Sequence, residues 1–213
     1  MRLSRATDFR LYLITDTSLC GGFEALCRSV EAALDAGVRA VQLREKGLPV
    51  RDYLARAEKM RVLTQRYGAR LFVNDRVDIA IAVDADGVHL GKTGIPPFAA
   101  KSVSGRLLVG SSTHSVAEAL CAEDEGADFI TIGPIFNTPS KSQYGKPVGL
   151  SVLRDIITAV SLPVYGIGGI KTHNAQEVLE AGACGIALIS GILAASDSRA
   201  STLEYLKLTG EDQ

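Results

Sequence analysis

The sequence predicts a single α/β domain folded as a (β/α)8 TIM barrel, and three observations lead to this fold class. Strand-like and helix-like segments alternate along all 213 residues, a pattern that is typical of a parallel sheet. The strand-like segments number eight. A weak internal repeat, in which a helix ends at a glycine and an apolar strand follows at once, favours a closed barrel over an open, doubly wound sheet.

Each expected strand is a short apolar run with little polar alternation, as a strand buried on both faces requires. The second, sixth and eighth strands directly follow the repeat glycines Gly37, Gly126 and Gly182. No Gly-x-Gly-x-x-Gly follows the first strand, so a dinucleotide-binding sheet is the weaker alternative. In chain order the expected strands are Arg10–Asp16, Ala40–Lys46, Arg70–Asn74, Gly87–Gly91, Leu107–Ser111, Phe129–Gly133, Pro163–Gly168 and Gly185–Ser190.

Helices are expected between these strands because apolar residues recur there at spacings of three and four. The clearest are Phe23–Ala36, Arg51–Tyr67, Val116–Glu125, Leu150–Val160 and Asn174–Ala181, with a shorter helical run at Val77–Val83.

Composition and charge exclude several classes of function. The net charge of -1 gives no basic excess for nucleic-acid binding. No run approaches the ~18 apolar residues of a membrane span. The first residues lack the apolar stretch of a signal peptide, and the four cysteines show no Cys-x-x-Cys spacing, so we expect a cytoplasmic protein with reduced thiols. We expect one domain over residues 1–213, with flexible ends at 1–8 and 209–213, and a homo-oligomer is left open.

Polar residues follow several strands, at the end of a barrel where active sites lie. Arg44, Lys46 and Lys141 come from different loops, and they could converge on a polyanion such as a diphosphate. Asp75 would then be an oxygen ligand for a Mg²⁺ ion bridging that diphosphate. The sequence therefore predicts small phosphorylated substrates as the ligands of this face.

Two glycine-punctuated runs after the seventh and eighth strands predict a second, separate phosphate site. They are Val164–Ile170 and Gly185–Gly191. Small residues expose backbone N–H groups, which can bind a phosphate without a cationic side chain. In barrels of this type a phosphate site commonly lies at these two loops.

Each of these features also has a purely structural interpretation. Arg44 and Lys46 could be solvated surface charges, and the glycines could simply permit close packing. Asp75 could cap the helical run that follows it, and Ser112 with Thr113 could cap the next helix. His89 lies within an expected strand, which favours a hydrogen-bonded core histidine over a ligand.

At these residues the chain resembles the family of thiamine-phosphate synthase and its thiazole tautomerase relatives. The resemblance runs from Leu11 to Leu193. Its motifs are Leu11-Tyr-Leu-Ile-Thr-Asp16, Val41-Gln-Leu-Arg-Glu-Lys46, Leu71-Phe-Val-Asn-Asp-Arg-Val-Asp78, Asp86-Gly-Val-His-Leu-Gly91, Gly110-Ser-Ser-Thr-His114, Ile132-Gly-Pro-Ile-Phe-Asn-Thr138, Gly166-Ile-Gly-Gly-Ile170 and Ala187-Leu-Ile-Ser190.

The resemblance implies a transferase of thiamine biosynthesis. This family joins hydroxymethylpyrimidine diphosphate to hydroxyethylthiazole phosphate, or its carboxylate, and releases diphosphate through a Mg²⁺-assisted carbocation mechanism. Arg44, Lys46, Lys141 and Ser112 would be the catalytic residues. The pyrimidine diphosphate would contact Gln42, Arg44, Lys46, Asn74, Ser112 and Lys141, Mg²⁺ would bind Asp75, and the thiazole phosphate would be held by Thr138, Ser140, Gly168, Gly169, Ile189 and Ser190.

Two positions depart from the synthase pattern. Gly94 stands where synthases carry a second Mg²⁺-binding aspartate, and Lys92 could supply part of the missing positive charge. Ser140 replaces a threonine but keeps its hydroxyl group.

Two other functions therefore stay open beside the synthase. A tautomerase would isomerise a thiazole phosphate carboxylate without Mg²⁺; Gly94 favours it, whereas Pro134 occupies the position of a tautomerase histidine. A non-catalytic barrel would bind thiazole or thiamine phosphate without turnover. In either enzyme, 137–148 is the candidate lid.

Overall fold

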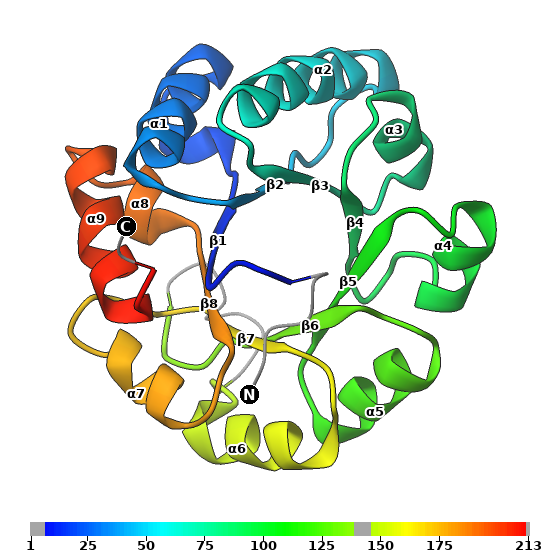
Figure 1. Ribbon diagram of the computed structural model, residues 1–213, viewed down its shortest axis with the longest axis vertical. Helices are drawn as coiled ribbons and strands as arrows, with labels where there is room; N and C mark the ends of the chain where they lie inside the picture. Colours follow the sequence, from blue (N-terminus) through cyan, green and yellow to red (C-terminus); the bar gives the residue numbers. More distant parts are fainter. Residues whose placement is uncertain (1–6, 139–145, 212–213) are drawn as a thin grey trace.

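The protein is a closed barrel of eight parallel strands surrounded by helices (Figure 1). The computed structural model describes residues 7–138 and 146–211. Each strand pairs with its neighbours in sequence, and β8 pairs with β1 in the register Tyr12 to Ala187 to complete the cylinder. The predicted fold class is confirmed.

All eight expected strands are present, with bounds that differ by a few residues. The strands are β1 Leu11–Ile14, β2 Ala40–Leu43, β3 Arg70–Asn74, β4 Gly87–Leu90, β5 Leu108–Thr113, β6 Phe129–Ile132, β7 Val164–Ile167 and β8 Gly185–Leu188. Most end earlier than expected, and the residues that follow them form the loops of the barrel mouth, whereas β5 extends two residues further, to Thr113. The expectation for the last strand was wrong at its end: β8 stops at Leu188, and Ser190 begins a helix.

The outer ring contains helices that the periodicity of the sequence did not indicate. In the described residues α4, α8 and α9 are additional to the expected set. The helices are η1 Thr17–Leu19, α1 Phe23–Ala36, α2 Val50–Arg66, α3 Val77–Ala82, α4 Pro97–Val103, α5 Val116–Asp124, α6 Gly149–Ala159, α7 Ala175–Glu180, α8 Ser190–Leu193 and α9 Ser198–Thr209.

Aromatic side chains fill the end of the barrel where the strands begin. Phe9, Tyr12, Phe72, Phe129 and Tyr165 are fully buried and pack as one cluster, separate from the larger core between sheet and helices. The segment that carries Phe9 crosses the barrel opening before β1 (Figure 1). Ligands must therefore enter from the opposite end, where the strands finish.

Parts of the expected flexible ends lie within the described residues. Thr7 is buried, and Asp8 forms an ion pair with Arg70. At the other end Glu211 accepts hydrogen bonds from the backbone N–H groups of Arg10 and Leu11, at 2.6 and 3.1 Å. The two ends thus contact each other beside the start of β1.

None of the helices among the described residues is both long enough and apolar enough to cross a membrane.

Candidate active site

Gln42 lies within β2, and Arg44, Glu45 and Lys46 follow the end of this strand at the barrel mouth. Gln42 is buried and donates from Nε2 to the Tyr12 hydroxyl at 3.1 Å. Arg44 is half-buried and Lys46 is exposed. The intervening Glu45 is engaged in an ion pair with Arg56 at 2.7 Å. Gln42 therefore points into the barrel interior, and Arg44 and Lys46 lie on the loop that follows β2.

Asp75 lies at the mouth, directly after β3, with its carboxylate held by two donors. Oδ1 accepts from the backbone N–H of Gly91 at 2.7 Å, and Oδ2 accepts from Asn74 Nδ2 at 2.8 Å. The backbone of Asp75 has a φ of 58°, a conformation that non-glycine residues seldom adopt. Its interpretation as a helix cap was wrong: Arg76 precedes α3, which has no side-chain cap.

Gly94 lies directly beside this carboxylate. A Cβ atom added to Gly94 would stand 2.6 Å from Asp75 Oδ1, nearer than non-bonded atoms approach. The Gly94 N–H donates to the Gly91 carbonyl at 2.9 Å, which folds the loop over Asp75. Position 94 is therefore adjacent to Asp75, as a second metal ligand would be, but here it carries no side chain.

Lys92 does not face this gap. Its ammonium forms an exposed ion pair with Glu118 at 2.9 Å, and Glu118 also contacts His114 Nδ1 at 3.1 Å. In the structure Glu118 engages the Lys92 ammonium group, and the suggestion that Lys92 supplies the missing charge stays a prediction.

Ser112 lies near the end of β5 and contacts a histidine inside the barrel. Its Oγ is 3.0 Å from His89 Nε2. Burial, with a smaller contribution from the charge of Arg44, lowers the pKa of His89 to about 3, so the imidazole is neutral near pH 7. The expectation of a hydrogen-bonded core histidine is confirmed.

Ser112 and Thr113 are not helix caps. Ser115 caps α5, and its side chain accepts from the Glu118 N–H. Thr113 instead donates to the Thr131 carbonyl at 3.1 Å within the barrel.

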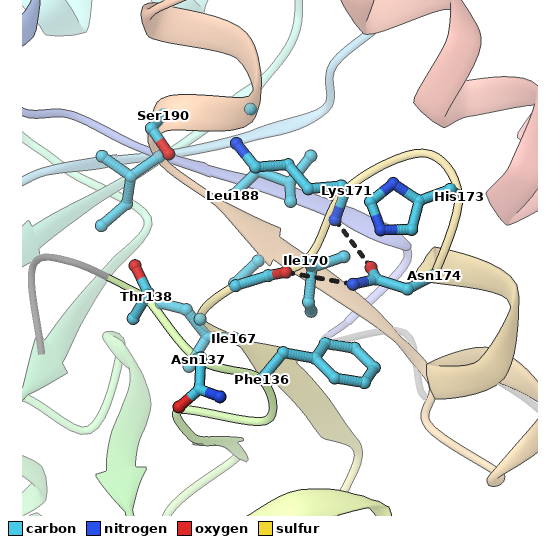
Figure 2. Close-up of a pocket in the computed structure, with 15 residues that line it drawn as sticks. Phe136, Asn137, Thr138, Ile167, Ile170, Lys171, His173, Asn174, Leu188 and Ser190 are labelled. Carbon is cyan, nitrogen blue, oxygen red and sulfur yellow. Dashed lines mark hydrogen bonds between the residues drawn. The ribbon is translucent and has the colours of Figure 1, made fainter. Parts of the chain in front are cut away.

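A cavity of about 470 Å³ opens between the loops that follow β6, β7 and β8 (Figure 2). Its lining combines apolar side chains, glycines and a few polar groups. The lining residues are Phe136, Asn137, Thr138, Ile167, Gly168, Gly169, Ile170, Lys171, His173, Asn174, Ala187, Leu188, Ile189, Ser190 and Gly191. This mixture is usual for a small-molecule site, and it brings together four predicted contact groups: Gly168–Gly169, Thr138, Ile189 and Ser190.

The two glycines of this cavity cannot be replaced without a rearrangement. Gly168 and Gly169 have φ values of 93° and 68°. A Cβ on Gly168 would lie 2.6 Å from Pro134 Cβ, and one on Gly169 would lie 2.6 Å from the Asn137 carbonyl oxygen. Glycine therefore provides both the turn and the close approach of the two loops.

Asn174 and Lys171 are among the lining residues that sequence reasoning did not predict. Asn174 holds the loop: its Oδ1 accepts from the Lys171 N–H at 2.7 Å, and its Nδ2 donates to the Gly169 carbonyl at 3.2 Å. Figure 2 shows the Lys171 side chain extending over Leu188 toward Ser190, which places a cation at the cavity. The sequence signal that could have identified both residues is the polar run Lys171-Thr-His-Asn174, which directly follows Gly168-Gly-Ile170.

Two predicted site residues, Ser140 and Lys141, and residues 139–145 of the candidate lid lie outside the described residues. Among residues 7–138 and 146–211, no three His, Cys, Asp or Glu side chains form a metal-binding group.

Together, the closed barrel, the polar groups at its mouth and the cavity beside its glycine loops define a barrel enzyme that binds phosphorylated small molecules. Residues 11–192 match the family model described as thiamine monophosphate synthase. The chain belongs to this family, as the sequence motifs predicted.

Individual relatives agree along almost the whole chain. A putative thiamine-phosphate synthase of Geobacter sulfurreducens is 52% identical over 203 residues, which are 94% of each chain. A thiamine-phosphate synthase of Chloroflexus aurantiacus is 43% identical over 213 residues, covering 100% of this chain and 98% of the relative. The solved thiamine phosphate pyrophosphorylase from Pyrococcus furiosus superposes with a TM-score of 0.89 at 41% identity and 98% coverage of both chains.

Proposed function

We propose that this protein is a thiamine-phosphate synthase that joins hydroxymethylpyrimidine diphosphate to hydroxyethylthiazole phosphate, or its carboxylate, and releases diphosphate. The observation that supports the proposal is that two groups of residues suited to anions lie on different loops of the barrel mouth. The cavity beside Gly168 and Gly169 suits a single phosphate, while Arg44, Lys46 and Asp75 lie on the loops after β2 and β3. Two phosphorylated substrates need such a pair of sites.

The pyrimidine diphosphate would bind at the loops after β2, β3 and β5. Arg44 and Lys46 would bind the diphosphate oxygens, with Lys141 as the third cation. The Gln42 amide oxygen is buried and has no hydrogen-bond partner in the described part of the chain. An unpaired buried acceptor costs about 1–3 kcal/mol, so a donor on the bound substrate would stabilise the complex.

The thiazole phosphate would bind in the cavity. Thr138, Ser190 and the backbone at Gly168 and Gly169 would hold its phosphate, and Ile189 would contact the remainder of the molecule. Lys171 would add a positive charge to this subsite.

With hydroxyethylthiazole phosphate as the acceptor, the bond exchange needs no proton transfer; with its carboxylate, CO2 must also leave and the ring carbon that carried it must take up a proton. The bond between the pyrimidine methylene carbon and the diphosphate oxygen breaks, and both electrons leave with the diphosphate. The thiazole nitrogen lone pair forms the new bond to that carbon. Arg44, Lys46 and Lys141 would stabilise the charge that develops on the leaving group, which lowers the barrel enzyme's transition-state energy.

The residues present fit a Mg²⁺ site with one protein carboxylate. Mg²⁺ is usually bound by one or two carboxylates together with substrate phosphates and waters. Asp75 supplies a fixed carboxylate at the mouth, and Gly94 beside it adds no second carboxylate, so the remaining ligands would be substrate phosphates and waters. When bound there, the ion would supply positive charge for the leaving diphosphate.

A tautomerase is the second candidate, and Gly94 is the observation that favours it. Without a second carboxylate beside Asp75, a diphosphate-bound metal loses one ligand, whereas an isomerase of thiazole phosphate carboxylate needs none. Such an enzyme would use the cavity in the same way. A non-catalytic barrel that binds the thiazole phosphate is the third.

One assay separates the three functions. Purified protein is mixed with both substrates and Mg²⁺, and thiamine phosphate is measured by chromatography; a parallel reaction holds only the thiazole phosphate carboxylate and a metal chelator. We expect thiamine phosphate in the first and no isomerisation in the second. Isomerisation without thiamine phosphate would establish the tautomerase, and phosphate binding with neither product would establish the binding protein.

A further inference from the structure

A continuous chain of hydrogen bonds crosses the barrel interior and ends at Ser112. Gln42 Nε2 donates to the Tyr12 hydroxyl at 3.1 Å. The same hydroxyl is 3.5 Å from His89 Nδ1, and His89 Nε2 is 3.0 Å from Ser112 Oγ. These residues come from β2, β1, β4 and β5, so the chain links half of the barrel.

The first donor favours one direction for the later hydrogen bonds. The Tyr12 oxygen accepts from Gln42, which leaves its own proton available to be donated to His89 Nδ1. A buried neutral imidazole has one N–H group and one acceptor nitrogen. If Nδ1 accepts, the proton is on Nε2, and Nε2 donates to Ser112 Oγ.

The barrel interior holds the imidazole ring in this orientation. The ring lies 5.7 Å, between centroids, from both Tyr12 and Phe129. Gly110 makes the space, because a Cβ there would lie 2.6 Å from His89 Nδ1. Thr131 Oγ1, at 3.4 Å from Nε2, is a more distant second contact for the same N–H.

We propose that His89 is a positioning residue, oriented by Tyr12 and Gln42, that makes the Ser112 hydroxyl a hydrogen-bond donor to the substrate. With its oxygen accepting from His89 Nε2, Ser112 directs its own proton to an acceptor atom of the pyrimidine diphosphate. The identity of that ligand rests on the proposed function. The direction of the hydrogen bonds does not depend on the proposed function, because it is a property of the ligand-free protein.

The direction is tested by ¹⁵N NMR of the histidine rings in the ligand-free protein. We expect His89 to be the Nε2–H tautomer, and Tyr12→Phe to lose this preference because Nδ1 then has no donor. Thr131→Val removes the second contact, so it should keep the tautomer. An Nδ1–H tautomer in the unmodified protein would overturn the proposal, whatever reaction the protein catalyses.

The consequence for Ser112 is tested with a matched pair of variants. In His89→Gln the amide nitrogen falls near the position of Nε2 and can still donate to Ser112. In His89→Asn the amide reaches only the Nδ1 position, so the donor to Ser112 is lost. We expect kcat to fall about tenfold in His89→Asn, equivalent to about 1.4 kcal/mol, and to stay within about threefold in His89→Gln.

The KM for the thiazole phosphate should stay constant in both variants, since its cavity lies between the loops that follow β6, β7 and β8. Equal losses in the two variants, or a rise in that KM alone, would contradict the positioning role. If the unmodified protein makes no thiamine phosphate, the proposed function fails, and the same comparison is made on the Kd of the pyrimidine diphosphate by calorimetry.

Discussion

The buried His89 should make the stability of this protein depend on pH, and His89→Gln should remove that dependence. In the folded protein burial lowers the pKa of His89 to about 3. In the unfolded chain a histidine has a pKa of about 6.5. Between these values the unfolded state binds the additional proton, so the free energy of unfolding falls as the pH falls. Above pH 7 both states are neutral and the residue contributes no pH dependence.

The magnitude follows from the two pKa values. A pH of 5.0 lies about 1.5 units below the pKa of the unfolded histidine, which is therefore protonated, while His89 in the folded protein is still neutral. At about 1.36 kcal/mol per unit, His89 lowers the free energy of unfolding by about 2 kcal/mol relative to pH 7.5. Groups that titrate in both proteins, such as the ion-paired Asp8 and Asp78, cancel when the variant is compared at the same pH.

The measurement is urea unfolding of both proteins at pH 7.5 and 5.0, with a metal chelator present. Between pH 7.5 and pH 5.0, the free energy of unfolding should fall by about 2 kcal/mol more in the unmodified protein than in His89→Gln. This holds whatever the difference in stability between the two proteins at pH 7.5. Equal losses would show that the imidazole is solvated or becomes charged in the folded state, and would refute the reasoning from burial.

Three other predictions concern the two anion sites. Lys171→Ala should raise the KM for thiazole phosphate about tenfold, most strongly at low salt, and leave the KM for unphosphorylated hydroxyethylthiazole unchanged. An equal rise in both KM values would contradict a contact between Lys171 and the phosphate. Gly169→Ala should abolish thiazole phosphate binding in calorimetry, whereas Gly126→Ala, with a φ of 85° and nothing within 4 Å of its added Cβ, should lower only the Tm. Gly94→Asp should lower the Mg²⁺ concentration for half-maximal activity once Asp75 adjusts to the new Cβ, and an unchanged metal requirement would place position 94 away from the ion.

The Gly94 prediction needs a steric control, because any Cβ at this position approaches Asp75 Oδ1. Gly94→Ala has the same contact without the carboxylate. A gain in metal affinity in Gly94→Asp alone therefore reports a new ligand, while equal changes in both variants report the displacement of Asp75.

The fold was predictable because the strands of a parallel barrel are buried on both faces. A short apolar run such as Phe129–Ile132 has few alternatives when helical spacing flanks it on both sides. The strand ends were harder to predict. Apolar Ile189 continues the β8 pattern in the sequence, yet the ladder stops at Leu188 and α8 begins at Ser190.

The sequence could single out candidate site residues by the charge or hydroxyl group that each carries, but it could not give the contacts that depend on neighbours in three dimensions. Tyr12 and His89 are 77 residues apart in sequence, so no local pattern links them. Lys171 resembles any exposed lysine until the loop after β7 places it beside the cavity. The sequence likewise could not decide whether Asp75 caps a helix or lies at the barrel mouth, because its hydrogen bond from the Gly91 N–H is seen only in the structure.

The contact between Glu211 and the backbone of Arg10 and Leu11 has a practical consequence for engineering. It brings the two terminal segments together at the start of β1, across the barrel from the mouth. A fluorescent protein, affinity tag or partner enzyme joined to the chain directly beside Thr7 or Glu211 would begin on the side of the barrel opposite to the substrate entrance. A short peptide joining the ends, with new termini opened in an outer loop, should give a circularly permuted protein with its mouth unchanged.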